Sequence, residues 1–247
     1  MKLKGKSAII TGAGRDIGRA CALALAAEGA NVAINYFSSS DGADSAVKEI
    51  NDAGGKAFAL QGDLSKPEGA EALVAKTVAE FGGVDVLINN SGGLVARKTI
   101  SEMSLEHWYT VMDLNLTSVF LMVKASLPHM KQGTIVNLAS QAGRDGGGPG
   151  SVPYASSKGA VMTMTRGLAK ELGPDIRVNA LCPGMIDTDF HNVHTKPEVR
   201  KMVENAAPVK RQGSSEDVAR LVAYLAGDDS AFITGANIDI NGGMLFS

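Results

Sequence analysis

Short, continuously apolar runs alternate with helical stretches along the whole sequence, and this alternation constrains the fold more than any other feature. Strands are expected at residues 7–10, 32–36, 56–60, 84–88, 134–138, 177–181 and 237–240. Helices are expected at residues 17–28, 43–52, 65–81, 104–130, 154–172 and 215–226. Strands without polar alternation are typical of a parallel sheet that helices cover on both faces. The sequence therefore predicts an α/β fold with a doubly wound, Rossmann-type sheet.

The domain organisation follows from the length of 247 residues and from the lack of a linker or repeat. We expect one dinucleotide-binding and catalytic domain over residues 1–247. The start of the third helix has capping-box spacing, Ser65-x-x-Glu68. Two stretches, 143–153 and 183–213, lack the alternating pattern. Because long segments of this kind are usually functional, we expect a substrate lid around residues 184–213.

Charge and cysteine content narrow the class of partner. The net charge is −2, whereas nucleic acid or an anionic membrane favours a basic face. The N-terminus lacks an apolar segment, and no run reaches the roughly 20 apolar residues of a membrane span. Cys21 and Cys182 read as reduced thiols, and His191 and His194 lack a third metal ligand. We expect a cytoplasmic protein with no nucleic-acid, membrane or metal partner.

A glycine-rich run follows the first expected strand and opens the first helix. Its sequence is Thr11-Gly12-Ala13-Gly14-Arg15-Asp16-Ile17-Gly18. Glycines at such a turn let the backbone approach a pyrophosphate at a helix N-terminus, although an ordinary tight turn has the same pattern. After the second strand no carboxylate occurs before Asp41. Ser38, Ser39 and Arg15 could accept a 2′-phosphate there, which favours NADP over NAD.

A tyrosine and a lysine four residues apart open the long helix at 154–172. Tyr154 and Lys158 lie one turn apart on one helix face, and a nearby ammonium lowers the pKa of a phenol. The pair therefore has a physical basis for acid/base chemistry, although such pairs also occur by chance. Ser140 follows a strand at the edge where ligands bind, and its hydroxyl could donate to a carbonyl oxygen. Asn115 is an unusual residue for a helix interior.

These features together resemble the short-chain dehydrogenase/reductase family over essentially the whole chain. The motifs that carry the resemblance are Thr11-Gly12 with Gly18, Asp63-Leu64, Asn89-Asn90-Ser91-Gly92, Asn115, Ser140, Tyr154 with Lys158, Asn179-Ala180 with Pro183-Gly184, and Ile233-Thr234-Gly235 with Gly242-Gly243. Each motif alone is weak, but the ordered set is specific.

The resemblance implies a role for each matching residue. Tyr154 would protonate the carbonyl oxygen, Ser140 would orient the carbonyl, Lys158 would hold the nicotinamide ribose and lower the tyrosine pKa, and Asn115 would fix a proton-relay water. The residues implied in cofactor binding are Gly12, Gly14, Arg15, Asp16, Ile17, Gly18, Ser38, Ser39, Asp63, Leu64, Asn90, Ser91, Gly92, Tyr154, Lys158, Pro183, Gly184, Ile186 and Thr188. Among these, Asp63 and Leu64 would flank the adenine, Asn90 would contact the adenosine ribose, and Ile186 and Thr188 the carboxamide.

One residue departs from the family pattern where it matters. Asp16 occupies the place of the middle glycine in the glycine-rich motif. Aspartate tolerates left-handed backbone dihedrals, so the turn can be retained, but its charge is unfavourable beside a pyrophosphate. The change from Asn-Asn-Ala-Gly to Asn-Asn-Ser-Gly at residues 89–92 is expected to be harmless.

The resemblance implies an oxidoreductase that transfers a hydride between NAD(P)(H) and a small-molecule carbonyl or secondary alcohol. A ketoreductase of 3-oxoacyl-thioester type is the first interpretation. A sugar or polyol dehydrogenase is the nearest alternative, since residues 183–213 contain both polar and apolar side chains. A silent dinucleotide-binding sensor is a further alternative. The family resemblance also implies a homotetramer formed through the helices at 104–130 and 154–172.

Overall fold

The computed structural model describes residues 1–247, and its centre is a parallel sheet of seven strands. The strands are β1 (Ser7–Ile10), β2 (Asn31–Tyr36), β3 (Lys56–Gln61), β4 (Val86–Asn89), β5 (Gly133–Leu138), β6 (Ile176–Pro183) and β7 (Asn237–Ile240). Their order across the sheet is β3-β2-β1-β4-β5-β6-β7, so the chain winds outward in both directions from β1 and β4. This topology confirms the predicted doubly wound fold.

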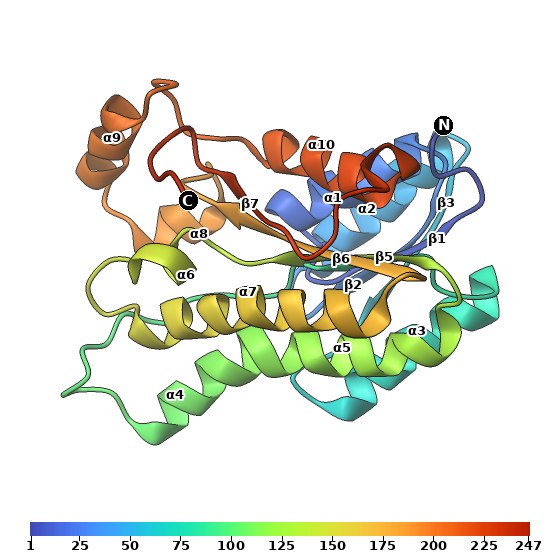
Figure 1. Ribbon diagram of the computed structural model, residues 1–247, viewed down its shortest axis with the longest axis horizontal. Coiled ribbons are helices and arrows are strands. Elements are labelled where there is room, and N and C mark those ends of the chain that lie inside the picture. Colours follow the sequence, from blue (N-terminus) through green and yellow to red (C-terminus); the bar gives the residue numbers. More distant parts are fainter.

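Helices cover both faces of the sheet (Figure 1). One face carries α1 (Asp16–Ala27), α2 (Ser40–Asp52) and α10 (Ser215–Ala226), and the other carries α3 (Pro67–Phe81), α5 (Ser118–Ser126) and α7 (Val152–Leu172). Each face has its own apolar core, with Ile10, Leu25 and Leu225 in the first and Leu87, Met122 and Ile135 in the second. β1 and β4 are buried at every position, which explains their lack of polar alternation.

The helix expected at 104–130 is four segments that follow one another without a gap. They are α4 (Leu105–Met112), the π-helical turn η1 (Asp113–Thr117), α5 and the 3-10 turn η2 (Leu127–His129). The run from Leu105 to His129 is long and apolar enough to cross a membrane, with a mean hydropathy of 1.2 over an 18-residue window. Its apolar residues Val119, Met122 and Val123 are buried in the second core, so packing against the sheet accounts for that composition.

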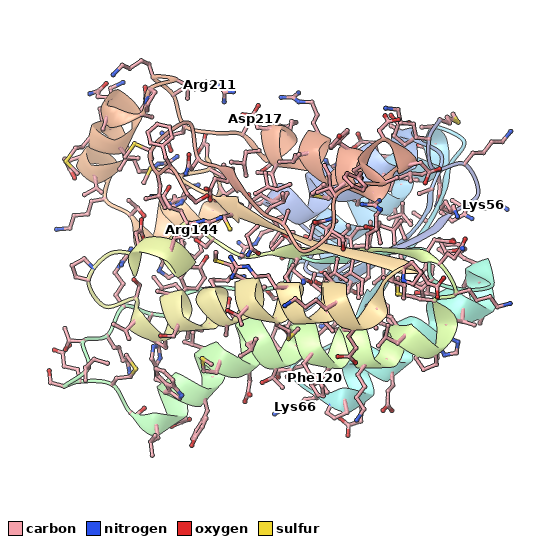
Figure 2. The ribbon with its side chains drawn as sticks, viewed as in Figure 1. Lys56, Lys66, Phe120, Arg144, Arg211 and Asp217 are labelled. Carbon is pink, nitrogen blue, oxygen red and sulfur yellow. The ribbon has the colours of Figure 1, made fainter.

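The sequence pattern missed three helices, all near the carboxyl ends of the strands. They are α6 (Ala142–Asp145), α8 (Asp189–His194) and α9 (Pro197–Ala206). α8 and α9 lie inside the stretch expected as an irregular lid, and the three helices gather at one end of the molecule (Figure 1). Arg144 of α6 is labelled in Figure 2. Its Nε forms a largely buried ion pair with Asp239 Oδ1, 2.7 Å away, which ties α6 to β7.

Helix starts follow local chemistry, with one correction to the sequence analysis. The capping box expected at Ser65-x-x-Glu68 is wrong: Lys66 is the N-cap of α3 and makes no side-chain cap. The Ser65 hydroxyl instead donates to Asp63 Oδ1 at 2.7 Å. A true capping box opens α10. The Ser214 hydroxyl accepts a hydrogen bond from the Asp217 N–H, and the Asp217 carboxylate accepts one from the Ser214 N–H. α10 is thereby fixed at the end of the lid.

Candidate active site

The glycine-rich turn between β1 and α1 has the close packing that only glycine permits. Gly12 has a φ of +61°, in the left-handed region. A Cβ on Gly18 would lie 2.4 Å from the Gly12 carbonyl oxygen and 2.5 Å from Asn90 Nδ2. The Asn90 amide in turn donates to the carbonyl oxygens of Thr11, at 2.9 Å, and Gly12, at 3.1 Å. Asn90 therefore holds the turn itself, a role that the sequence analysis did not assign.

Asp16 keeps the backbone conformation that its position requires. Its φ is +49°, as expected of an aspartate that replaces a glycine. The carboxylate accepts a long hydrogen bond of 3.4 Å from the Asp189 backbone N–H and lies 3.9 Å from Arg15 Nε. Burial raises the pKa of Asp16 above its ordinary value. The side chain thus points toward the lid, where it meets the first residue of α8.

The N-terminus of α1 suits an anionic ligand. Arg15 is its N-cap and provides no side-chain hydrogen bond to the free backbone N–H groups of the first turn. A cavity of about 740 Å³ opens directly on this turn, and Gly12, Arg15, Asp16, Ile17 and Gly18 line it. Unsatisfied N–H groups at a helix N-terminus are the usual pyrophosphate site of dinucleotide-binding sheets. The residues present therefore fit a dinucleotide, with the Asp16 carboxylate as the unfavourable member.

Several of the expected cofactor residues lie outside this cavity. Gly14 packs against the β2–α2 turn, where a Cβ would come within 2.6 Å of the Ser39 carbonyl oxygen. Leu64 is buried in the second core, and the Asp63 carboxylate is bonded to Ser65. Ser38, Ser39, Asp63, Leu64, Ser91 and Gly14 do not line the cavity, whereas Asn90, Gly92, Pro183, Gly184, Ile186 and Thr188 do. Arg15 donates to Asp189 Oδ2 at 3.1 Å and so faces the lid in this structure.

Tyr154 and Ser140 lie together on the cavity wall, brought there by α7 and by the turn that follows β5. Burial raises the pKa of the Tyr154 phenol, and a hydrogen bond from Ser140 opposes the rise. Burial and Ser140 are the causes of this shift, and the lowering of the tyrosine pKa by Lys158 stays a prediction. The phenol is therefore the stable form at neutral pH.

Lys158 is buried beneath the tyrosine. Its Nζ donates to the Leu138 carbonyl oxygen at 2.6 Å and lies 5.8 Å from the centre of the Tyr154 ring. Burial lowers the pKa of Lys158 to about 8. A Cβ on Gly92 would lie 3.0 Å from this ammonium, so glycine is required where β4 ends. The ammonium therefore has one protein acceptor and an open side toward the cavity.

Asn115 occupies the π-helical turn η1 and is fully buried. Its Nδ2 donates to the carbonyl oxygens of Gly93 and Val111, both at 2.8 Å, and its Oδ1 accepts from the Gly93 N–H at 2.9 Å. The asparagine thus locks the segment after β4 to α4 and α5. A Cβ on Gly92 would lie 2.6 Å from Asn115 Oδ1, which places the amide beside Lys158. π-turns of this kind are frequent at functional sites.

The segment around α8 closes the cavity from the other side. The Phe190 ring lies 5.7 Å from the Tyr154 ring and 5.1 Å from the His194 ring. The His191 Nδ1 is 2.8 Å from Thr195 Oγ1, and burial together with Arg200 and Arg97 lowers its pKa to about 4. Both histidines are therefore lid residues with neutral rings at physiological pH. Phe190 therefore packs against Tyr154.

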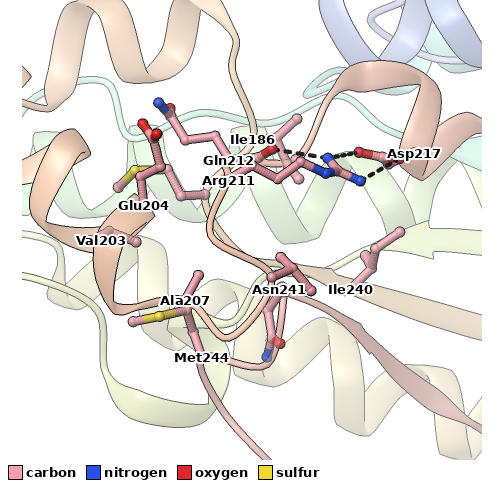
Figure 3. A pocket seen from close by; sticks show the side chains of 14 residues that line it. Ile186, Val203, Glu204, Ala207, Arg211, Gln212, Asp217, Ile240, Asn241 and Met244 are labelled. Carbon is pink, nitrogen blue, oxygen red and sulfur yellow. Dashed lines mark hydrogen bonds and ion pairs between the residues drawn. The ribbon is translucent and has the colours of Figure 1, made fainter.

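A second, smaller cavity of about 220 Å³ lies between α9, the C-terminal segment and the start of α10 (Figure 3). Arg211 and Asp217 form an ion pair at its rim. Met185, Ile186, Val203 and Met244 line both cavities. The smaller cavity is therefore the rear side of the same lid.

The sequence analysis missed Phe190 and Arg97 as cavity residues. Phe190 lies on α8, and Arg97 lies in the segment between β4 and α4. Neither belongs to a motif with fixed spacing, and both reach the cavity only through the folded lid and loops. A local signal exists for the lid, because Pro197 stands at the start of α9.

Comparison with known proteins agrees with this geometry. A family model described as enoyl-(acyl carrier protein) reductase matches residues 12–245. The 3-oxoacyl-(acyl-carrier-protein) reductase FabG of Staphylococcus epidermidis is 40% identical over 97% of this chain and 98% of its own length. Glucose 1-dehydrogenase 2 of Bacillus subtilis is 40% identical over 98% of this chain and 95% of its own.

Solved structures show the same likeness. A short-chain dehydrogenase/reductase from Brucella melitensis, described as a glucose/ribitol dehydrogenase, superposes with a TM-score of 0.94 at 32% identity over 100% of this chain and 99% of its own. A blue fluorescent protein from a metagenomic library, in complex with NADPH, gives a TM-score of 0.94 at 34% identity over the full length of both chains. The chain therefore belongs to the short-chain dehydrogenase/reductase family.

Proposed function

We propose that this protein is an NADPH-dependent ketoreductase that converts a carbonyl compound to a secondary alcohol. The observation that carries the proposal is the placement of Tyr154 and Ser140 on the same cavity as the uncapped N-terminus of α1. The nicotinamide, when bound, supplies the hydride. The pairing of an acid with a dinucleotide cradle supports hydride transfer over simple binding.

Tyr154 acts as the general acid. Its raised pKa keeps the phenol protonated, so that its proton is available to the oxygen of a carbonyl undergoing reduction. The Ser140 hydroxyl donates a second hydrogen bond to that oxygen and stabilises its developing charge. Lys158 holds ribose hydroxyls with its ammonium and lies where it can return a proton toward Tyr154. Asn115 fixes the segment that bounds this proton path.

Cofactor choice rests on the turn after β2. Ser38 and Ser39 follow that strand without a carboxylate that would repel a 2′-phosphate. Arg15 is exposed and can turn from its surface ion pair with Asp189, because such pairs contribute little to stability. The structural relative that holds NADPH is consistent with this choice. We therefore place NADP(H) before NAD(H).

The substrate is a 3-oxoacyl thioester in the first instance. Relatives at the same identity carry two names, a 3-oxoacyl reductase and a glucose dehydrogenase. The cavity offers both apolar side chains, such as Leu94 and Val199, and polar ones, such as Gln141 and His194. A sugar or polyol remains the alternative substrate. A silent sensor is disfavoured because Ser140, Tyr154 and Lys158 are all in place.

Cellular context follows from the same family. A cytoplasmic homotetramer is proposed, assembled through α4, α5 and α7, with residues 1–247 as one domain and residues 184–213 as the substrate lid. α8 and α9 of that segment line the cavity, which is the observation that favours a lid.

A titration with NADPH and with NADH tests the proposal. Tighter binding of NADPH, followed by its oxidation with ketone substrates, is the expected result. The substrate panel pairs 3-oxoacyl thioesters with aldoses and polyols, the latter assayed in the oxidative direction with NADP⁺. Cofactor binding with no turnover of any substrate in the panel would contradict the proposed reductase activity. Equal use of NADH and NADPH would contradict the proposed cofactor preference.

A further inference from the structure

The segment between β4 and α4 contains a strained turn at the cavity. Val95 has a φ of +64°, which a β-branched residue rarely adopts. The Ala96 N–H donates to the Leu94 carbonyl oxygen at 2.8 Å, so the strain is concentrated in a three-residue turn centred on Val95. Leu94, Val95 and Arg97 all line the cavity. Strained backbone that is retained at a ligand site points to a function for the side chain that it directs.

Arg97 is the side chain that this turn directs, and it joins three loops at the mouth of the cavity. Its Nη1 donates to the Pro149 carbonyl oxygen at 2.9 Å, and its Nε donates to the His194 carbonyl oxygen at 3.2 Å. Pro149 belongs to the glycine-rich stretch before α7, and His194 ends α8. The guanidinium therefore connects its own loop with the catalytic helix and the lid.

The glycine-rich stretch fits around this side chain. A Cβ on Gly150 would lie 3.0 Å from Arg97 Cβ, and one on Gly148 would lie 3.3 Å from Arg97 Nη1. The Lys98 N–H also donates to the Gly150 carbonyl oxygen at 3.0 Å. Gly148 and Gly150, two of the glycines in this stretch that the catalytic roles leave unexplained, thus allow the close approach of Arg97.

The charge of Arg97 has no protein counterpart. Both of its hydrogen bonds go to neutral carbonyl oxygens. The guanidinium is exposed at the mouth of the cavity, and no carboxylate pairs with it. Asp145, which shares the cavity, is bonded to Gln141 and to the Gly147 N–H. The neighbouring rings of His191 and His194 are neutral. A fixed guanidinium without a carboxylate is suited to bind an anion.

We propose that Arg97 is a specificity-determining residue that binds an anionic group of the substrate, so that the preferred substrate is an oxo compound with a carboxylate or phosphate remote from the reacting carbonyl. The inference rests on the proposed ketoreductase function and adds a substrate class to it. Phe190 lies between Tyr154 and His194 and so separates the reacting carbonyl from the anion site.

The test compares oxo acids with their methyl esters in matched pairs, with one to four methylene groups between carbonyl and carboxylate. The wild-type enzyme is expected to prefer the acid of one chain length. In Arg97→Gln, kcat/KM for that acid falls by roughly 10- to 100-fold, chiefly through KM, while kcat/KM for the ester is unchanged. Arg97→Lys keeps the positive charge but loses the bidentate hydrogen-bonding geometry of the guanidinium. It is therefore expected to retain part of the preference for the acid over the ester.

Lys98→Gln is the matched control, because it removes a neighbouring positive charge from a residue that does not line the cavity. It is expected to leave both substrates unaffected. The Kd for NADPH is measured for each variant and is expected to stay at the wild-type value, which separates anion binding from damage to the loops. Equal use of acid and ester by the wild type, or an equal loss of both in Arg97→Gln, would overturn the proposal.

Two further experiments complete the test. The first identifies which anionic group Arg97 binds, and the second distinguishes a failure of the anion site from a failure of the ketoreductase proposal. Acetoacetyl-4′-phosphopantetheine and acetoacetyl-pantetheine differ only in one phosphate, so a selective loss on the phosphorylated thioester in Arg97→Gln identifies a phosphate as the anion. Calorimetry with a 3-hydroxy acid and its methyl ester, with and without NADPH, needs no turnover. An Arg97-dependent preference for the acid without reduction of any ketone would keep the anion site and reject the ketoreductase.

Discussion

At the scale of single residues, Tyr154 is the side chain on which the chemistry depends. We expect Tyr154→Phe to lower kcat by about 10²- to 10⁴-fold, because the phenylalanine ring keeps the packing against Phe190 but has no proton to donate. The Kd for NADPH should stay within about twofold, since the hydroxyl is one contact among many. Steady-state kinetics and fluorescence titration measure the two quantities.

Tyr109→Phe is the control for this substitution, because Tyr109 is exposed on α4 and remote from the cavity lining. Its kinetics should match the wild type. Activity of Tyr154→Phe within tenfold of the wild type would assign the acid to another group.

Lys158 has a pKa of about 8, low for a lysine, because burial disfavours its charge. The ammonium is therefore present below about pH 8 and is lost as the pH rises through this value. If the charged form is required, kcat/KM for reduction is flat below pH 8 and falls about tenfold per unit above it. The pH profile of kcat/KM gives the kinetic pKa, and a ¹⁵N NMR titration of Lys158 Nζ gives the pKa of the lysine itself. Activity that persists to the ordinary lysine pKa of about 10.4 would contradict this assignment.

Asp16 combines backbone strain with an unfavourable charge at the pyrophosphate cradle. Glycine at this position would relieve the strain of φ +49° and remove a half-buried carboxylate. We expect Asp16→Gly to bind NADPH about 5- to 30-fold more tightly, from about one to two kcal/mol of relieved repulsion. Calorimetry on Asp16→Gly and Asp16→Asn separates backbone from charge, because Asn keeps the side chain and lacks the charge. Weaker binding in both would show that Asp16 contributes to the site through Asp189.

At the scale of elements, the strands and the long helices could be predicted because local patterns determine them. β1, β7 and α10 begin and end at the predicted residues. α6, α8 and α9 could not be predicted, since short helices in a lid are stabilised by neighbours rather than by their own periodicity. Arg200 illustrates this, because it joins α9 to Asn192 of α8 and to Gln212. The π-turn at Asn115 likewise depends on Gly93, a tertiary contact.

Ser214 allows a test of how much one helix cap contributes to stability, because its side chain caps the N-terminus of α10. We expect Ser214→Ala to lower the free energy of unfolding by about 1 kcal/mol through loss of the hydrogen bond to the Asp217 N–H. Urea denaturation should show a lower midpoint with an unchanged m-value. Ser39→Ala is the matched control, since Ser39 is the N-cap of α2 but makes no capping hydrogen bond. An equal loss in both variants would mean that capping is not the cause.

At the scale of the whole molecule, the sequence could predict that the proposed catalytic residues lie together, but not which residues of the loops would join them at the cavity. Ser140, Tyr154 and Lys158 follow strand ends and a helix start, and parallel topology brings such positions to one edge. Arg97 and Phe190 reach the cavity only because the lid folds over that edge. Conversely, Leu64 and Asp63 match a family motif but face the core and a local turn. Motifs therefore predict the proposed chemistry, whereas the proposed substrate specificity rests on contacts between loops that the sequence does not reveal.

The outer surface of α4 and α5 argues for assembly into the proposed tetramer. Leu105, Tyr109 and Phe120 are 71%, 58% and 50% exposed, and Phe120 points away from the sheet (Figure 2). Large apolar side chains that gather on one surface favour contact with another subunit. We expect the wild type to be a tetramer in light scattering, and Phe120→Asp to be a smaller species, because a charge would have to be buried without a partner.

Lys48→Glu on α2 is the control, since it alters charge on an exposed helix of the opposite face. It should remain tetrameric at every concentration tested, whereas Phe120→Asp should dissociate further on dilution. The cavity opens at the carboxyl edge of the sheet and not on the α4–α5 surface, so the smaller species should keep its Kd for NADPH. A wild type that is monomeric throughout would reject the tetramer while leaving the catalytic assignment intact, because Ser140, Tyr154 and Lys158 meet on one cavity within a single chain.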